Sequence, residues 1–202
     1  MAGNDSLWRG TSPEERSGDR RDRLIAACLQ LVGAEGTAAL AVRAVCRQAN
    51  VSHRYFYEHF PDADALLVAT YERAVQELLA AVTAAIPSGG EPADALRASF
   101  AAAADFLEQH PLHGRLIFTE ALTHDVLRDR AVQVLPGFLS AVHGVAVTPG
   151  GGPPRALPTT MLAGGLAALF TAWLSGTAEF TRDELVDYCT AATVALLSTE
   201  QD

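Results

Sequence analysis

The sequence predicts an all-α protein of about nine helices, divided into a small N-terminal head and a larger helical body. Two observations support this prediction. Half of the 202 residues are apolar (49%), with alanine and leucine abundant, and such residues favour helices over strands. Apolar residues also recur at intervals of three and four along most of the chain, whereas no segment shows the strict alternation of a half-buried strand.

The first helix is expected after the polar segment 1–19, which has no hydrophobic period and is predicted to be a disordered arm. Leu24, Cys28 and Leu31 begin an apolar stripe. The stripe ends at Gly36, a residue suited to a helix C-terminus. Turn and capping residues then bound the other expected helices, at 42–48, 52–59, 63–85, 92–110, 112–122, 125–147, 157–175 and 183–198. Proline and glycine at 136–137 should kink or split the helix at 125–147, and 148–154 is typical of a loop.

Charge is distributed unevenly along the chain. The net charge is −9, and all fifteen basic residues are arginine. Residues 20–60 hold six arginines and three acidic residues, whereas residues 61–202 hold seven arginines and seventeen acidic residues. A basic head on an acidic body is compatible with phosphate binding by the head alone. Three cysteines without a CxxC pair indicate reduced thiols, and neither a signal peptide nor a membrane span is evident, so a cytoplasmic protein is expected.

The head contains a helix-turn-helix signal, VRAVCRQANVSHRYFYEHF, between Val42 and Phe60. Two short helices meet at Asn50, a residue type that tolerates the left-handed backbone of a tight turn. Ser52 is suited to cap the second of them. In this motif the second helix lies in the major groove of DNA.

This stretch resembles the TetR family of transcriptional regulators. The resemblance covers roughly residues 20–67, about a quarter of the chain, and includes RLIAACLQLVGAEG, VRAVCRQANVS and YFYEHFPDADALL. It implies a two-fold symmetric dimer, a DNA-binding domain over 20–62, and a ligand-binding and dimerisation domain over 63–202. By motif, the DNA-contacting residues would be Ser52, His53, Arg54, Tyr55 and Tyr57, to which Arg43 and His59 are added as polar neighbours. A plain surface or packing role stays open for Arg43, His53, Tyr57 and His59.

Three positions depart from the family pattern. Ala41 stands where serine or threonine usually caps the second helix, a loss of about 1 kcal/mol of capping. Asn50 replaces the turn glycine, and Ala63 replaces a basic residue at the start of the fourth helix. Phosphate contacts are therefore expected to be missing at Ala41 and Ala63, with the arginines between 20 and 23 compensating from the arm.

The body carries no recognisable motif. Its aromatic residues are spread over several helices and could line a cavity for a small, largely apolar effector, or could simply form the core. Polar residues on apolar faces need a partner, which a ligand could be. The residues expected to bind the ligand are Phe106, His113, Phe118, Thr119, Thr123, Phe138, His143, Phe170 and Trp173.

The last two predicted helices are apolar on more than one face, and small residues among them permit close approach of another helix. They are expected to form a four-helix bundle with a second copy of the chain, although they could instead close the core of the monomer. The residues expected at this interface are Leu162, Gly165, Leu166, Leu169, Leu185, Cys189 and Leu196.

These observations predict a homodimeric transcriptional regulator, by default a repressor, which binds a near-palindromic operator in double-stranded DNA and is released by its ligand. Two alternatives remain: a helical ligand-binding or adaptor protein that has lost DNA binding, and a helical enzyme. No nucleophile–base arrangement or phosphate-binding loop is evident, so no enzymatic activity is expected. His110 and His113 are separated by Pro111 without further ligands at suitable spacing, so neither a metal nor a cofactor is expected.

Overall fold

The computed structural model describes residues 13–87, 89–146 and 156–198. Within these ranges the regular secondary structure is entirely helical, which confirms the predicted all-α fold. Counting the segment 111–123 as one helix gives nine helices in the described part. The elements are α1 (Pro13–Glu35), a 3-10 turn η1 (Thr37–Ala39), α2 (Val42–Ala49), α3 (His53–His59), α4 (Ala63–Ala84), α5 (Pro92–Gln109), α6 (Pro111–Gly114), a π-helical turn η2 (Arg115–Glu120), α7 (Ala121–Thr123), α8 (Asp125–Ala146), α9 (Ala156–Leu174) and α10 (Arg182–Ser198).

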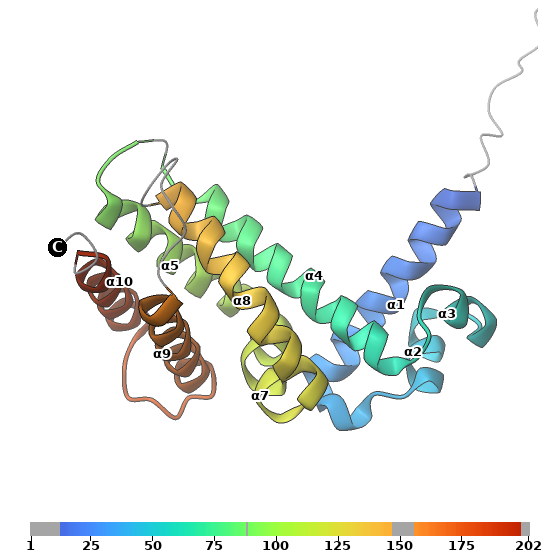
Figure 1. Cartoon of the computed structure of the whole chain (residues 1–202). Coiled ribbons are helices and arrows are strands. Elements are labelled where there is room, and N and C mark those ends of the chain that lie inside the picture. The colour runs from blue at the N-terminus through green and yellow to red at the C-terminus, as the bar shows by residue number, and fades with distance from the viewer. Residues whose placement is uncertain (1–12, 88, 147–155, 199–202) are drawn as a thin grey trace, which may run out of the picture.

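Figure 1 shows a head of three helices, α1, α2 and α3, beside a larger body. α4 leads from the head into the body, where α5 and α8 pack along it. α10 packs against α5, and α9 lies beside α10 at the end of the body opposite the head. α4 is therefore the helix that belongs to both parts of the molecule.

α1 begins at Pro13, inside the segment 1–19 that the composition indicates as a disordered arm. That prediction is wrong for residues 13–19, which form the first turns of a long helix, and residues 1–12 lie outside the described part. Proline is favourable at a first helical position, where its missing N–H costs no hydrogen bond within the helix. The arginines at 20, 21 and 23 are therefore carried on a helix.

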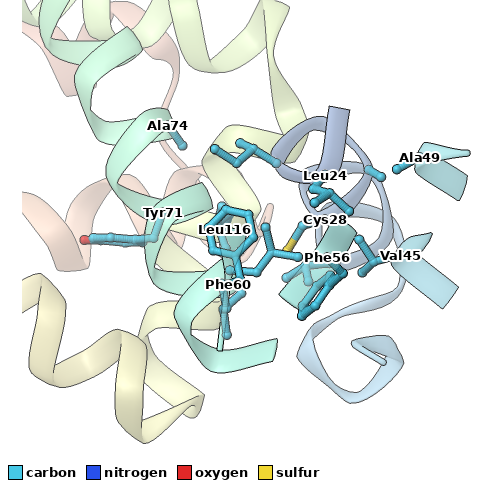
Figure 2. Packing of buried hydrophobic residues seen from close by; sticks show 14 of the residues in the cluster. Leu24, Cys28, Val45, Ala49, Phe56, Phe60, Tyr71, Ala74 and Leu116 are labelled. Atoms are coloured by element: carbon cyan, nitrogen blue, oxygen red, sulfur yellow. The ribbon is translucent and has the colours of Figure 1, made fainter. Parts of the chain in front are cut away.

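A cluster of fully buried side chains holds the three head helices together (Figure 2). Leu24 and Cys28 of α1 pack with Val45 of α2 and Phe56 of α3. The cluster continues into the body through α4 and η2, where Leu116 is also fully buried. Because burial of each large apolar side chain stabilises the fold by about 1.5–3 kcal/mol, the short helix α3 is firmly seated although it makes only two turns of helix.

The turn between α2 and α3 has the predicted geometry. Asn50 adopts the left-handed conformation, with φ 52° and ψ 48°. Ser52 caps α3, since its Oγ accepts a hydrogen bond from the amide of Tyr55 at 3.5 Å. Ala41 precedes α2 without a side-chain cap, so the expected capping contribution is missing.

The segment between α5 and α8 differs from the ordinary helix predicted over 112–122. Its middle, from Arg115 to Glu120, is a π-helical turn. Such a turn changes the backbone hydrogen bonds but leaves the hydrophobic pattern almost unchanged, so the sequence does not reveal it. α9 packs closely on this segment: a Cβ at Gly114 would lie 3.1 Å from Leu174, and the Thr171 hydroxyl lies 3.4 Å from the carbonyl oxygen of Phe118.

A buried carboxylate connects the head to the body. Glu120, at the end of η2, accepts hydrogen bonds from the amide and the hydroxyl of Thr37 at 2.9 and 3.0 Å. Arg115 donates through Nε to the other Glu120 oxygen at 3.1 Å, and through Nη1 to the carbonyl of Ala34 at 2.7 Å. The last carbonyls of a helix lack partners within the helix, so Arg115 completes the end of α1. We call Thr37, Arg115 and Glu120 the head–body junction.

Two glycines allow the close approach of α1 to this segment. A Cβ at Gly33 would lie 2.6 Å from the Cβ of Leu112, a distance that would force the backbones apart. Gly36 has a φ of 88°, which L side chains rarely adopt, and a Cβ there would lie 3.0 Å from the Arg115 guanidinium. The predicted helix end at Gly36 is confirmed, and the same residue also makes room for the junction.

The three cysteines are buried and unpaired. Burial raises the pKa of Cys28 and of Cys189 to about 11. Since the thiolate is the reactive form, these thiols act as packed apolar groups at neutral pH.

α8 runs without interruption past Pro136 and Gly137, so the predicted split does not occur there. The predicted loop at 148–154 lies outside the described residues. Within the described part, no helix combines the length and the apolar character that spanning a membrane requires.

Glu120→Gln is expected to destabilise the protein by about 2 kcal/mol, because it removes charge-assisted hydrogen bonds at a buried position. Burial by itself would raise the pKa of Glu120, but the hydrogen bonds from Thr37 and Arg115 and the charge of Arg115 outweigh it and lower that pKa. A carboxyl with a lowered pKa in the folded state stabilises the fold fully above its unfolded pKa of about 4.3. The stabilisation is lost as the pH falls through the lower folded value.

Urea unfolding of wild type and Glu120→Gln between pH 3 and pH 7 measures this difference. It should be constant near neutral pH and shrink below about pH 4. Glu108→Gln, on the exposed surface of α5, is the matched control and should have little effect. A Glu120→Gln variant as stable as the control would show that the junction contributes nothing.

Candidate nucleic-acid interface

α3 presents its polar side chains to solvent because its apolar side is committed to the core. Phe56 is the fully buried residue of this helix. The five contact residues predicted by motif are all exposed: Ser52, His53, Arg54, Tyr55 and Tyr57. Their exposure makes them available to DNA, which is the property that a recognition helix requires.

Tyr57 and Tyr55 stand on the two flanks of this exposed face. The Tyr57 ring meets Phe56 edge-on, with 5.2 Å between ring centroids, and 59% of the residue remains exposed. Tyr57 therefore rests on the core without being enclosed by it. The Tyr55 ring is covered on one side by the guanidinium of Arg20.

The two other predicted contact residues differ from each other. Arg43 is exposed near the start of α2, beside α3. His59 is only half-buried, but its Nε2 atom is enclosed and has no hydrogen-bond partner. The Nε2 edge of His59 therefore faces the protein, which makes it the weakest of the predicted contacts.

Glu58 belongs to the exposed face of α3, although it is not among the predicted contact residues. It pairs with Arg54 one turn earlier, with 3.4 Å between Oε1 and Nε. The Arg54 side chain is 87% exposed, so solvent screens the pair and its contribution is only about 0.3 kcal/mol. Arg54 can exchange this weak partner for a phosphate or a guanine. The spacing of four residues is a signal that could have identified the pair from the sequence.

The start of α4 does not supply the basic group that the resemblance implies. Ala63 is followed by no nearby cation, and Asp62 caps the helix by accepting a hydrogen bond from the amide of Ala65 at 2.8 Å. The start of α4 therefore carries a carboxylate, at the point where the family pattern has a basic residue that contacts phosphate.

Four of the predicted ligand-binding residues come together in the body, where they are packed against one another. The rings of Phe118 and Phe170 stack with centroids 5.6 Å apart, and Trp173 meets Phe170 edge-on at 6.1 Å. Phe106 belongs to the same apolar cluster. The sequence left open whether these aromatic residues line a cavity or form the core, and in this structure their contacts with one another are those of a core.

The predicted polar ligand residues are less uniform. His113 is buried, and its Nε2 lies 2.8 Å from Oε2 of Glu77 on α4, so it has a partner within the protein. Thr119 and Thr123 are exposed. The side chains of Phe138 and His143 lie outside the described residues. Among the residues that the structure describes, no group of three or more histidine, cysteine and acidic side chains is arranged to hold a metal ion.

α9 and α10 both contribute a face to the chain's own core. Leu185 and Cys189 of α10 are 2% and 0% exposed within the single chain, where α5 packs against α10. Their burial favours the alternative that this side of α10 closes the chain's own core. Leu166 and Leu169 are half-buried in the same cluster. Leu162 and Leu196 are half-buried as well, and Gly165 is exposed.

Two short helices joined by a left-handed turn, with an exposed polar second helix, define the helix-turn-helix class of DNA-binding domains. Residues 24–70 match the sequence profile of bacterial regulatory proteins of the tetR family. This segment, about a quarter of the chain, is therefore similar to the N-terminal part of tetR-family regulatory proteins. No curated protein matches the chain in sequence.

Solved structures of regulators share the fold over most of the chain. The fatty acid degradation regulator FadR from Bacillus halodurans is 15% identical, with 91% of this chain and 95% of that chain covered and a TM-score of 0.69. A TetR transcriptional regulator from Rhodococcus sp. RHA1 is 20% identical, with 91% and 98% covered and a TM-score of 0.67. The regulator FadR from Bacillus subtilis, solved with stearoyl-CoA, is 16% identical, with 84% and 95% covered and a TM-score of 0.67.

Glu58→Gln is expected to strengthen DNA binding, because it removes a negative charge from the exposed face of α3 and releases Arg54. Fluorescence anisotropy with a labelled duplex between 50 and 200 mM salt, a range of strong salt dependence for such contacts, measures the effect. The affinity should rise several-fold at the lower salt concentration and the salt dependence should become steeper. Glu108→Gln is the control for loss of one acid elsewhere. A weaker Glu58→Gln complex would contradict the expectation and would indicate that Glu58 itself accepts a hydrogen bond from a base.

Proposed function

We propose that this protein is a transcriptional regulator, acting as a repressor, that binds a near-palindromic operator as a homodimer and releases it when a small, largely apolar ligand binds in the body. The observation that carries the proposal is the exposed start of α3, with Ser52, His53 and Arg54, on a helix seated in a buried core. A rigid helix with several exposed hydrogen-bonding side chains is what direct reading of base edges requires.

Comparison with the related fold supports the ligand part of the proposal. The Bacillus subtilis regulator with this fold was solved with stearoyl-CoA, a molecule with a long apolar chain. In the present chain the body contains a cluster of aromatic and aliphatic side chains, among them Phe118, Phe170 and Trp173. A ligand entering this cluster would have to separate side chains that now touch, and so would favour a different arrangement of the helices around them.

Two connections lead from this cluster to the head. Phe118 lies in η2, the turn that ends at Glu120 in the head–body junction. His113 on α6 pairs with Glu77 on α4, the helix that continues into the head. A ligand changes DNA affinity only if it binds the DNA-bound and the DNA-free arrangements of the protein with different affinities. These two connections would pass a movement of the body to the head and so to α3.

The exposed surface of α9 supports a dimer. Gly164 and Gly165 are exposed, and a Cβ at either would meet nothing within 4 Å in the single chain. Met161, one turn earlier, is 63% exposed. Small residues beside an exposed apolar side chain allow a second helix to pack at close range. A dimer also places two recognition helices on two half-sites, which one small domain needs for specificity.

The test of the proposed function is selection of genomic DNA fragments on the purified protein, followed by sequencing, at two salt concentrations. Wild type should enrich a near-palindromic site whose affinity falls steeply with salt. Arg54→Ala should reduce this enrichment, because Arg54 is the arginine of α3 and its side chain is 87% exposed. Arg128→Ala, which removes an exposed arginine from α8 in the body, should leave it unchanged.

Failure to enrich any site at either salt concentration would contradict DNA binding. The missing contacts at Ala41 and Ala63 would then favour a ligand-binding or adaptor protein that keeps the helix-turn-helix without using it.

Gly165→Arg is expected to convert the dimer to a monomer, because the new side chain would block the approach of a second helix while meeting nothing in its own chain. Light scattering after size-exclusion chromatography measures the mass. Gly137→Arg on α8 is the matched control, since a Cβ at that exposed glycine also meets nothing within 4 Å. An unchanged mass for Gly165→Arg would contradict the proposed position of the interface.

A further inference from the structure

Two consecutive arginines of α1 cover aromatic rings at opposite ends of α3. The guanidinium carbon of Arg20 lies 4.3 Å from the ring centroid of Tyr55, in the first turn of α3. That of Arg21 lies 5.4 Å from the ring of Phe60, the residue that ends α3. Both distances are within the range of a cation–π interaction, and the Arg20 contact is well inside it.

The contact with Arg20 secures a part of α3 that the core does not. α3 has seven residues, and Phe56 is its only buried one. Tyr55 is 40% exposed and lies on the flank of the helix that faces α1. A helix this short is not stable by itself and takes its orientation from its contacts. The orientation of the first turn, with His53 and Arg54, therefore depends on what holds Tyr55.

Arg20 is committed to this ring and to no other group that the structure describes. Its Nε is enclosed and has no hydrogen-bond partner. The nearby Asp22 pairs instead with Arg73 of α4, at 2.8 Å. Enclosing a guanidinium nitrogen without a partner costs free energy, so the face of the ring is the interaction that compensates for it.

We propose that Arg20 is a positioning residue for DNA recognition, which holds the Tyr55 ring and thereby sets the angle at which the first turn of α3 meets the base edges. This inference rests on the proposed function. It differs from the expectation that the arginines at 20–23 supply phosphate contacts from a flexible arm, because Arg20 here belongs to a helix and acts through Tyr55.

The test is a double-mutant cycle on the selected operator, with Arg20→Met, Tyr55→Leu and the double variant. Arg20→Met should weaken operator binding about tenfold when Tyr55 is present, which is the range expected from loss of a cation–π contact. In the Tyr55→Leu background the same substitution should weaken binding much less. Arg20→Lys should recover part of the loss, since an ammonium group can also lie over the ring. Tyr55→Phe keeps the ring and should preserve the effect of Arg20→Met.

Two further readouts separate positioning from phosphate binding. A residue that binds phosphate weakens specific and non-specific binding alike and reduces the salt slope by about one when it is removed. Arg20→Met should instead lower the ratio of operator to non-specific affinity. Its salt slope should match that of wild type and of Arg128→Ala, the control for an exposed arginine on α8 in the body. Unchanged circular dichroism and melting temperature would show that the variants fold.

Additive effects of Arg20→Met and Tyr55→Leu, or a uniform loss of affinity with a reduced salt slope, would overturn the inference while leaving the proposed function intact. A wild-type protein that selects no operator would overturn both.

Discussion

A buried carboxylate joins the C-terminal end of α1 in the head to η2 in the body. Glu120 receives the amide and hydroxyl of Thr37 on one oxygen and Arg115 on the other, while Arg115 also closes the end of α1 through the carbonyl of Ala34. These bonds act on the C-terminal end of α1, whose earlier turns carry Arg20 and supply Leu24 and Cys28 to the head core. Because Arg115 is partly exposed, its ion pair with Glu120 fixes the geometry of the junction more than it stabilises the fold.

The same junction lies where the body's aromatic cluster meets the head. Phe118 stacks on Phe170 and belongs to the π-helical turn that ends in Glu120. Packed interiors do not deform continuously, so a change at this turn would shift it between discrete arrangements. A π-helical turn is suited to such a change, because it holds one residue more than an α-helical turn and such turns are frequent at functional sites. On the proposed function, this is the step between ligand and DNA.

Much of the fold could be predicted from local sequence signals. Most helix boundaries, the left-handed Asn50, the Ser52 cap and the exposed start of α3 follow from short-range chemistry. Long-range partners could not be predicted: the Thr37–Glu120 contact spans 83 positions and His113–Glu77 spans 36. Hydrophobic periodicity also cannot say which apolar face of α10 meets its own chain, and the burial of Leu185 and Cys189 in the single chain could not be read from the sequence. The helical start of α1 could not be predicted because residues 13–19 are polar, and a polar segment carries no hydrophobic period.

The central claim is that two of these heads bind successive turns of one DNA duplex. Hydroxyl-radical footprinting of the wild-type protein on its selected site tests this directly. The account predicts two protected regions related by a two-fold axis, separated by about one helical turn or a multiple of it. Methylation of guanine N7 should be blocked in the major groove within each region, where Arg54 would contact the bases. A single protected region, or protection without a defined position, would contradict the claim.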